Sequence, residues 1–156
     1  MKIDGLKDVY NKCIAGGRFF EKNAVDDELI RSLKDIADKG LDFTRRKMKD
    51  IPQDSPDWTF VFRDHYEALR SLIEAFLLFD RIEAENHQCM NAYLCHKHPG
   101  LDLDWEFLET IRLKRNAINY RGHLMQHDDW KRIRLQLELY ITTLMKEIEV
   151  RLARHE

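Results

Sequence analysis

The 156-residue sequence is poor in helix-breaking residues, with only six glycines and three prolines. It also lacks long apolar runs: the longest, residues 75–79, falls far below the roughly 18 residues that span a bilayer. The first residues lack the apolar stretch of a signal peptide. Three cysteines make an odd number without the spacing of a disulfide framework, so we expect free thiols in a reducing compartment. These absences predict a cytoplasmic protein without a membrane anchor.

The composition that remains favours helices. Charged residues make up 35% of the chain and apolar residues 44%. This combination is typical of amphipathic helices with solvated charged faces, and it argues against a turn-rich β sandwich. The length suits a single core. The sequence therefore predicts an all-α protein.

Apolar residues recur every three or four positions in six segments, several of which have capping signals at their ends. The expected helices cover residues 6–13, 26–48, 56–79, 84–96, 104–122 and 128–148, with Ser55 as the N-cap of the third, Asp104 as the cap of the fifth and Gly122 at its end. The apolar face of the third expected helix becomes wider towards its end, so we expect this helix at the centre of the core. Gly40 lies on the apolar stripe of the second, which predicts a close helix crossing there. Residues 1–25 are expected to form a short helix and a linker, and residues 26–152 a bundle of about five to six helices.

The charge of the chain is distributed unevenly. The net charge is −2, which excludes a uniformly basic nucleic-acid binder. Residues 111–134 nevertheless hold seven basic residues against Asp128 and Asp129. The basic residues are Arg112, Lys114, Arg115, Arg121, Lys131, Arg132 and Arg134. Such a patch can hold a phosphate or an acidic partner, or it can be two helices with solvated basic faces.

Arg115 interrupts the apolar stripe of the fifth expected helix. The stripe runs through Ile111 and Ile118, and position 115 completes it. A guanidinium on an apolar stripe is costly unless it is paired or faces a phosphate or an interface. Asn116 lies beside it, and Asn119 and Tyr120 follow one turn later. Two interpretations stay open: a polar site near the end of this helix, or a buried arginine paired with an acid of the third helix, such as Glu74.

This segment resembles the signature of the HEPN family of small helical domains. The signature is Arg, usually followed by a polar residue such as Asn, then four to six residues, then His; Arg115 and Asn116 match its start. Residues 68–78 are similar to the family's central helix, including its Glu-Ala pair, and residues 86–90 to the start of the next helix. The resemblance covers roughly residues 26–152.

The resemblance implies an up-and-down bundle similar to the C-terminal helical domain of kanamycin nucleotidyltransferase. It also implies a homodimer, in which the Arg-to-His motifs of two subunits face each other across a cleft. Active members of the family cut RNA without a metal: His transfers protons, while Arg holds the phosphate and its developing charge. Other members are the helical partner of a minimal nucleotidyltransferase.

The end of the signature departs from the family pattern. Tyr120 stands where the shortest form has His, and His123 follows only after seven intervening residues. Tyrosine titrates near pH 10 and histidine near 6.5, so Tyr120 is a poor proton shuttle at neutral pH. It can still bond to a phosphate or stack on a base.

We therefore expect a module that binds RNA or nucleotide phosphate, as the partner of a nucleotidyltransferase or within a toxin–antitoxin system. The alternatives are a metal-independent endoribonuclease and a non-catalytic structural or interaction bundle. The expected catalytic residues are Arg115, Asn116, Tyr120 and His123, and the expected phosphate-binding residues are Arg112, Arg115, Asn119 and Arg121.

The sequence predicts no cofactor and no metal. It has no Gly-rich phosphate loop, nucleophile elbow or metalloprotease motif. One cluster has side chains that suit zinc, but it lacks the close cysteine pairs of zinc sites. Its members are His87, Cys89, Cys95, His96 and His98.

Overall fold

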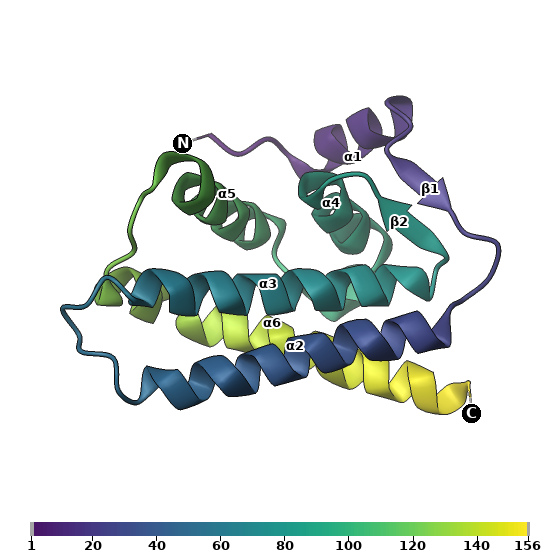
Figure 1. Ribbon diagram of the computed structural model, residues 1–156. Helices are drawn as coiled ribbons and strands as arrows, with labels where there is room; N and C mark the ends of the chain where they lie inside the picture. The colour runs from purple at the N-terminus through teal and green to yellow at the C-terminus, as the bar shows by residue number, and fades with distance from the viewer. Residues whose placement is uncertain (1, 156) are drawn as a thin grey trace.

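The computed structural model describes residues 2–155, which form six α-helices and two short strands (Figure 1). In chain order the elements are α1 (Leu6–Ala15), β1 (Phe19–Glu21), α2 (Asp27–Met48), α3 (Trp58–Leu78), β2 (Ile82–Ala84), α4 (His87–Lys97), the 3-10 turn η1 (Pro99–Leu101), α5 (Trp105–Arg121) and α6 (His127–Arg154). The expectation of an all-α bundle is confirmed.

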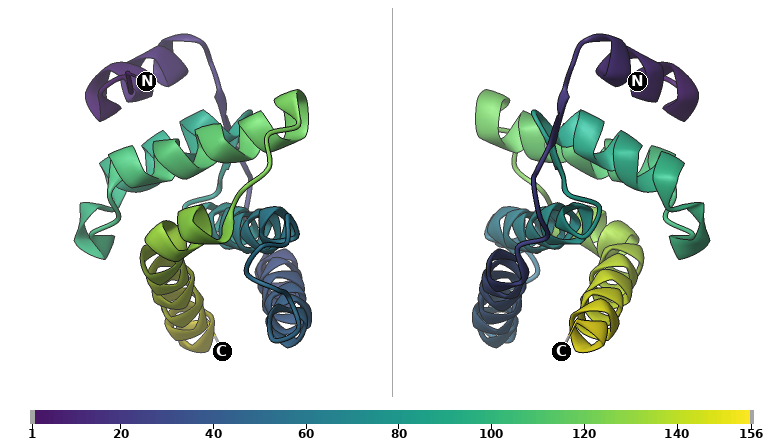
Figure 2. Two further views of the ribbon diagram at one scale, coloured as in Figure 1. Left: turned by 90° about the vertical axis from the view of Figure 1, so that its left-hand side faces the viewer. Right: turned by 90° about the vertical axis from the view of Figure 1, so that its right-hand side faces the viewer.

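Helix α3 is the centre of the structure. It packs against α2 and α6 on one side and against α4 and α5 on the other (Figure 2). Because it is covered on both sides, it buries apolar residues around most of its circumference, including Phe62, Leu72 and Phe76. The predicted central position of this helix is therefore confirmed.

The expected start of the third helix is wrong by two residues. Ser55 accepts a hydrogen bond from the Asp57 amide in a turn, and α3 begins only at Trp58.

Other helices begin or end where local signals in the sequence place them. The side chain of Asp26 accepts a hydrogen bond from the Leu29 amide at the start of α2, and Asp104 does the same for Phe107 at the start of α5. Gly122 ends α5 in a left-handed conformation, with φ 65°.

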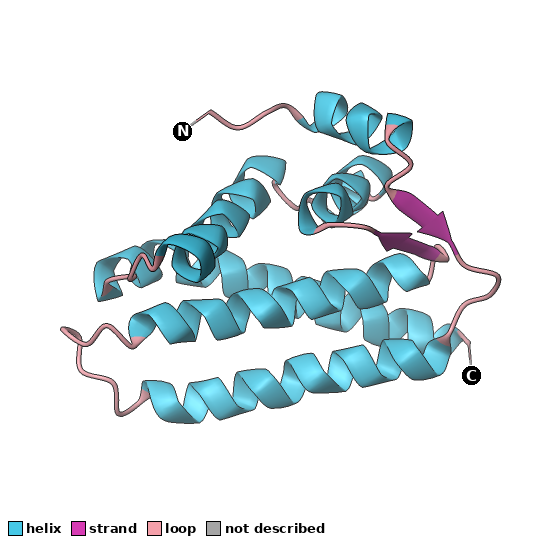
Figure 3. Cartoon of the chain, turned by 45° about the horizontal axis from the view of Figure 1, so that its top comes forward, coloured by secondary structure: helices cyan, strands magenta, loops and turns pink. Residues whose placement is uncertain are grey.

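Two short strands were not predicted. Strand β1 pairs antiparallel with β2, with Phe20 opposite Glu83 (Figure 3). Residues 19–21 fall in the expected linker, and residue 84 was expected to begin the fourth helix. That helix instead begins at His87, where Asn86 caps it by accepting from the Cys89 amide. Three-residue strands are too short to show the alternation by which sequence identifies a strand.

The predicted helix crossing at Gly40 is wrong within this chain. Gly40 faces solvent, and a Cβ placed on it would have no atom within 4 Å. The core side of α2 lies elsewhere on its circumference, at Ile30, Ala37 and Leu41. The apolar stripe of α2 is wider than its buried part, and the periodicity does not show which edge is covered.

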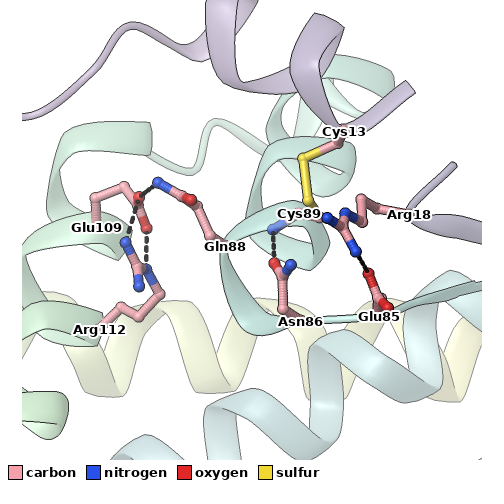
Figure 4. Close-up of a disulfide and its surroundings, with 8 residues drawn as sticks. All are labelled: Cys13, Arg18, Glu85, Asn86, Gln88, Cys89, Glu109 and Arg112. Carbon is pink, nitrogen blue, oxygen red and sulfur yellow. Dashed lines mark hydrogen bonds and ion pairs between the residues drawn. A yellow bond between two sulfur atoms is a disulfide. The ribbon is translucent and has the colours of Figure 1, made fainter. Parts of the chain in front are cut away.

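The prediction of free thiols is wrong for two of the three cysteines. Helix α1 packs on α4, and a disulfide joins Cys13 to Cys89 (Figure 4). Only Cys95 is a free thiol, and it is buried. The pair is 76 residues apart, so spacing along the chain gave no sign of it. The cysteine count therefore no longer argues for a reducing compartment.

As for membranes, no helix within residues 2–155 combines the length and apolar character needed to cross one.

Candidate functional site

Arg115 lies on α5 against the central helix, with 17% of its side chain exposed. Its Nε lies 3.3 Å from the Glu67 carboxylate of α3, and its Nη1 donates to the Asn116 side chain at 3.4 Å. The guanidinium carbon also lies 5.9 Å from the centre of the Tyr66 ring. An acid of the third helix was a possible partner from the sequence, with Glu74 as the example, and in the structure this acid is Glu67. Glu74 instead accepts from Arg70 on its own helix at 3.1 Å.

Arg112, one turn earlier on α5, is held by a buried carboxylate. Its guanidinium donates to both oxygens of Glu109, at 2.6 and 3.0 Å. Gln88 of α4 donates to the same carboxylate at 2.8 Å, so this pair also joins α4 to α5 (Figure 4). Glu109 is almost fully buried, which is tolerable because both oxygens are paired.

A solvent-open groove lies between the start of α4 and α5. Its cavity volume is about 430 Å³. Arg112, Arg115, Asn116 and Tyr120 line it from α5. The wall from α4 and the preceding turn consists of Glu85, Asn86, His87 and Gln88. We call this the α4–α5 groove.

His87 is the histidine of this groove, and it was not among the expected site residues. Burial lowers its pKa below the usual value, and the nearby positive charges of Arg70 and Arg115 lower it further. Its Nδ1 lies 3.4 Å from the hydroxyl of Tyr66, whose own pKa burial raises to about 12. The imidazole is therefore neutral at pH 7. In the sequence, the only feature that could have identified His87 as a site residue was its position after Asn86, at the start of a helix.

His123 lies in a different hollow. It is exposed and lines a space of about 170 Å³ together with Lys114, Ile118 and Met125, between the end of α5 and the start of α6. Gly122 turns the chain at the end of α5, and the amide of His123 bonds back to the Ala117 carbonyl.

The structure therefore brings together only part of the expected site. Arg112, Arg115, Asn116 and Tyr120 share the α4–α5 groove, whereas Asn119, Arg121 and His123 are not among its lining residues.

Acidic neighbours pair with part of the basic segment. Arg132 lies 3.6 Å from Asp129, and Arg134 lies 3.5 Å from Glu138, both on α6. Only Arg112 and Arg115 of the seven basic residues line the groove. Glu67 and Glu109 bond to these two arginines and offset part of their charge, and Glu85, which pairs with Arg18, also lines the groove. An anion would thus be held by directed hydrogen bonds more than by net charge.

The cluster of cysteines and histidines is dispersed. Cys89 is in the disulfide, His96 stacks on Tyr10 with ring centres 3.9 Å apart, and His98 bonds to Asp80 at 2.6 Å. Within residues 2–155, no three His, Cys, Asp or Glu side chains are grouped so that they could hold a metal ion.

The groove thus combines two guanidiniums, three side-chain amides, a neutral imidazole and an exposed phenol. These groups can donate to phosphate oxygens, accept a proton and stack on a base.

Comparisons with family models, with curated proteins and with solved structures gave no match to this chain.

Proposed function

We propose that this protein binds RNA or nucleotide phosphate in the α4–α5 groove. The observation that carries the proposal is the grouping of Arg112, Arg115, Asn116 and Tyr120 around one open cavity. Two of the five N–H groups of Arg115 are bonded to Glu67 and Asn116, which leaves donors that can face a phosphate. Because those bonds also fix the direction of the guanidinium, it loses little freedom on binding.

Tyr120 gives the groove a surface for a base. Its side chain is 76% exposed at the rim of the groove, so the ring is free to stack on an unpaired base next to a bound phosphate. This supports a single-stranded RNA or a nucleotide as the ligand.

The proposed partners follow from the resemblance to HEPN domains. We propose that the chain forms a homodimer and works beside a nucleotidyltransferase or within a toxin–antitoxin pair. The helical bundle and the position of Arg115 near the end of α5 are compatible with that proposal.

Binding of a fluorescent single-stranded RNA to Arg115→Ala tests the main proposal. We expect affinity to fall about tenfold or more, since a charge-assisted bond to phosphate is worth roughly 1.5–3 kcal/mol. The salt dependence of binding should become shallower, because one phosphate contact is lost. Arg132→Ala is the matched control: it removes an exposed arginine of α6 outside the groove and should bind as the wild type does. Equal affinity of both variants, with thermal unfolding showing that Arg115→Ala is folded, would contradict the proposal.

A second candidate is a metal-independent endoribonuclease, and the position of His87 favours it. His87 is neutral and lies in the same groove as both arginines. In this reaction His87 takes the proton of a ribose 2′-hydroxyl, whose oxygen then attacks the neighbouring phosphorus. The bond from phosphorus to the 5′ oxygen breaks, and that oxygen takes a proton from water. Arg115 stabilises the extra negative charge on the phosphate. The products are a 2′,3′-cyclic phosphate and a 5′-hydroxyl.

Incubation of RNA with the protein in EDTA tests this candidate. Cyclic-phosphate products that His87→Ala abolishes and His123→Ala retains would support His87 as the base. Loss in His123→Ala alone would assign the reaction to His123, as the family signature suggests. Intact RNA after prolonged incubation with the wild type would exclude the nuclease and leave the binding proposal standing.

A further inference from the structure

Helix α2 exposes an apolar stripe that the fold of one chain leaves uncovered. Leu29, Ile36 and Phe43 are spaced seven residues apart and are 42%, 68% and 49% exposed. Residues seven apart lie on one side of a helix, at the spacing of a helix–helix seam. Phe60, at the start of α3, is exposed as well. We call Leu29, Ile36, Gly40 and Phe43 the outer stripe of α2.

A hollow of about 300 Å³ lies beside the outer stripe, between α2 and α3. Ile36, Gly40 and Phe43 line it from α2, and Ala68 and Ser71 from α3. Because Gly40 has no side chain and no neighbouring atom within 4 Å of an added Cβ, another helix could approach the backbone closely there.

The chain's own stability does not account for these residues. The core of the chain uses a different side of α2, at Ile30, Ala37 and Leu41. A glycine inside a helix costs about 1 kcal/mol relative to alanine, and large exposed apolar residues at a regular spacing mark interaction surfaces. The outer stripe therefore has the features of a second interface.

The charges of α2 indicate what covers this surface. Its first turn is acidic, with Asp27 and Glu28, and its last turn is basic, with Arg45, Arg46 and Lys47. A second copy of α2 packed antiparallel about a two-fold axis would place each acidic end against a basic end. The same arrangement, centred between Ile36 and Gly40, would direct Ile36 of each copy towards the hollow beside Gly40 of the other.

We propose that two copies of this chain pair through the outer stripe of α2 in an antiparallel arrangement. This goes beyond the proposed homodimer by naming its surface, and it does not depend on phosphate binding. Glu67 lines the hollow and also bonds to Arg115, so one ion pair connects this surface with the α4–α5 groove of the same copy.

Sedimentation equilibrium of Ile36→Glu and Leu135→Glu tests the surface. Both positions are exposed leucine or isoleucine on a helix, but Leu135 lies on α6, away from the hollow. A buried carboxylate in the interface should weaken the dimer at least tenfold. The Leu135→Glu control should dimerise as the wild type does. Equal dimerisation of the two variants, or a wild type that stays monomeric at the highest concentration reached, overturns the proposal.

Four further variants test the arrangement. Glu28→Lys and Lys47→Glu should each weaken the dimer, and the double variant should restore it, because each acidic end faces a basic end of the other copy. Gly40→Ala should weaken the dimer as well, although alanine fits the single chain without a clash. If the double variant stays as weak as the single ones while Ile36→Glu is monomeric, the antiparallel arrangement is wrong. RNA binding that persists in the monomeric variants would show that the α4–α5 groove of a single copy binds RNA without the dimer.

Discussion

At the scale of single residues, the buried polar groups of this bundle depend on partners that other helices supply. Thr44 of α2 donates to Asp64 of α3 at 2.8 Å, and Gln88 of α4 donates to Glu109 of α5. Two ring nitrogens are exceptions among the described residues: Nε2 of His65 and Nε1 of Trp130 are buried without a hydrogen-bond partner. Nδ1 of His65 bonds to the Val61 carbonyl of its own helix at 2.8 Å. Of the two side chains only the imidazole can take up a proton, and protonation of His65 would place a charge inside the core.

Burial lowers the pKa of His65 below its usual value of 6.5. The bonded Val61 carbonyl and the carboxylate of Glu138 on α6, 3.7 Å from Nε2, oppose the shift, whereas Arg45 of α2 adds to it. The unfolded chain consequently takes up a proton at higher pH than the folded chain. We expect this contribution to the free energy of unfolding to be fully present above about pH 6.5 and to be lost as the pH falls below that value. The slope is up to about 1.4 kcal/mol per pH unit for each such histidine.

Urea unfolding at several pH values between 7.5 and 5 measures this slope. His87 has a lowered pKa too and should contribute in the same direction. His65→Gln should therefore reduce the slope without removing it. His123→Gln, which changes an exposed histidine, is the control and should leave the slope unaltered. A wild-type stability that is constant across this range would contradict the assignment.

At the scale of elements, capping at both ends sets the length of α5. Asp104 begins it by capping the Phe107 amide, and Gly122 ends it with φ 65°. The amides of Gly122 and His123 bond to the carbonyls of Ile118 and Ala117, which closes the last turn. This turn separates Arg115 and Tyr120 from His123, so the end of α5 decides which side chains share the groove.

Substitution of Gly122 by alanine should destabilise the protein by about 1 kcal/mol, because a Cβ disfavours the left-handed conformation. Gly122→Asn should cost less, since asparagine adopts this conformation more readily than alanine. Thermal and urea unfolding of the two variants provide the comparison. Equal stability of the wild type and Gly122→Ala would show that the turn is free to change its conformation.

At the scale of the whole molecule, the disulfide attaches the outermost helix to the rest of the fold. Helix α1 packs on α4, and Cys13–Cys89 closes a loop of 76 residues. Since a cross-link over such a distance restricts the unfolded chain strongly, its removal should lower the free energy of unfolding by about 2–4 kcal/mol.

Thiol titration in denaturant and unfolding of Cys13→Ser together test this role. Without reductant, the unfolded protein should show one reactive thiol, from Cys95, and with reductant three. Cys13→Ser and the reduced wild type should unfold at similar, lower urea concentrations than the oxidised wild type. Three reactive thiols in the untreated protein would rule out the disulfide.

The sequence by itself determined the features that depend on neighbouring residues. Helical periodicity, the cap at Asp104 and the stop at Gly122 act over a few positions, and the structure confirms them. The sequence also identified Arg115 as a polar residue on an apolar stripe. Its need for a partner follows from the cost of burying a charge.

Only the tertiary structure decided which residues meet. Arg115 and Glu67 are 48 residues apart, and Cys13 and Cys89 are 76 apart. The placement of His87 in the α4–α5 groove, with His123 outside it, depends in the same way on how α4 lies beside α5. Helix periodicity shows that a face is apolar, but it does not show which helix covers that face. For this reason the helices could be predicted from sequence, while the members of the groove and the uncovered stripe of α2 could not.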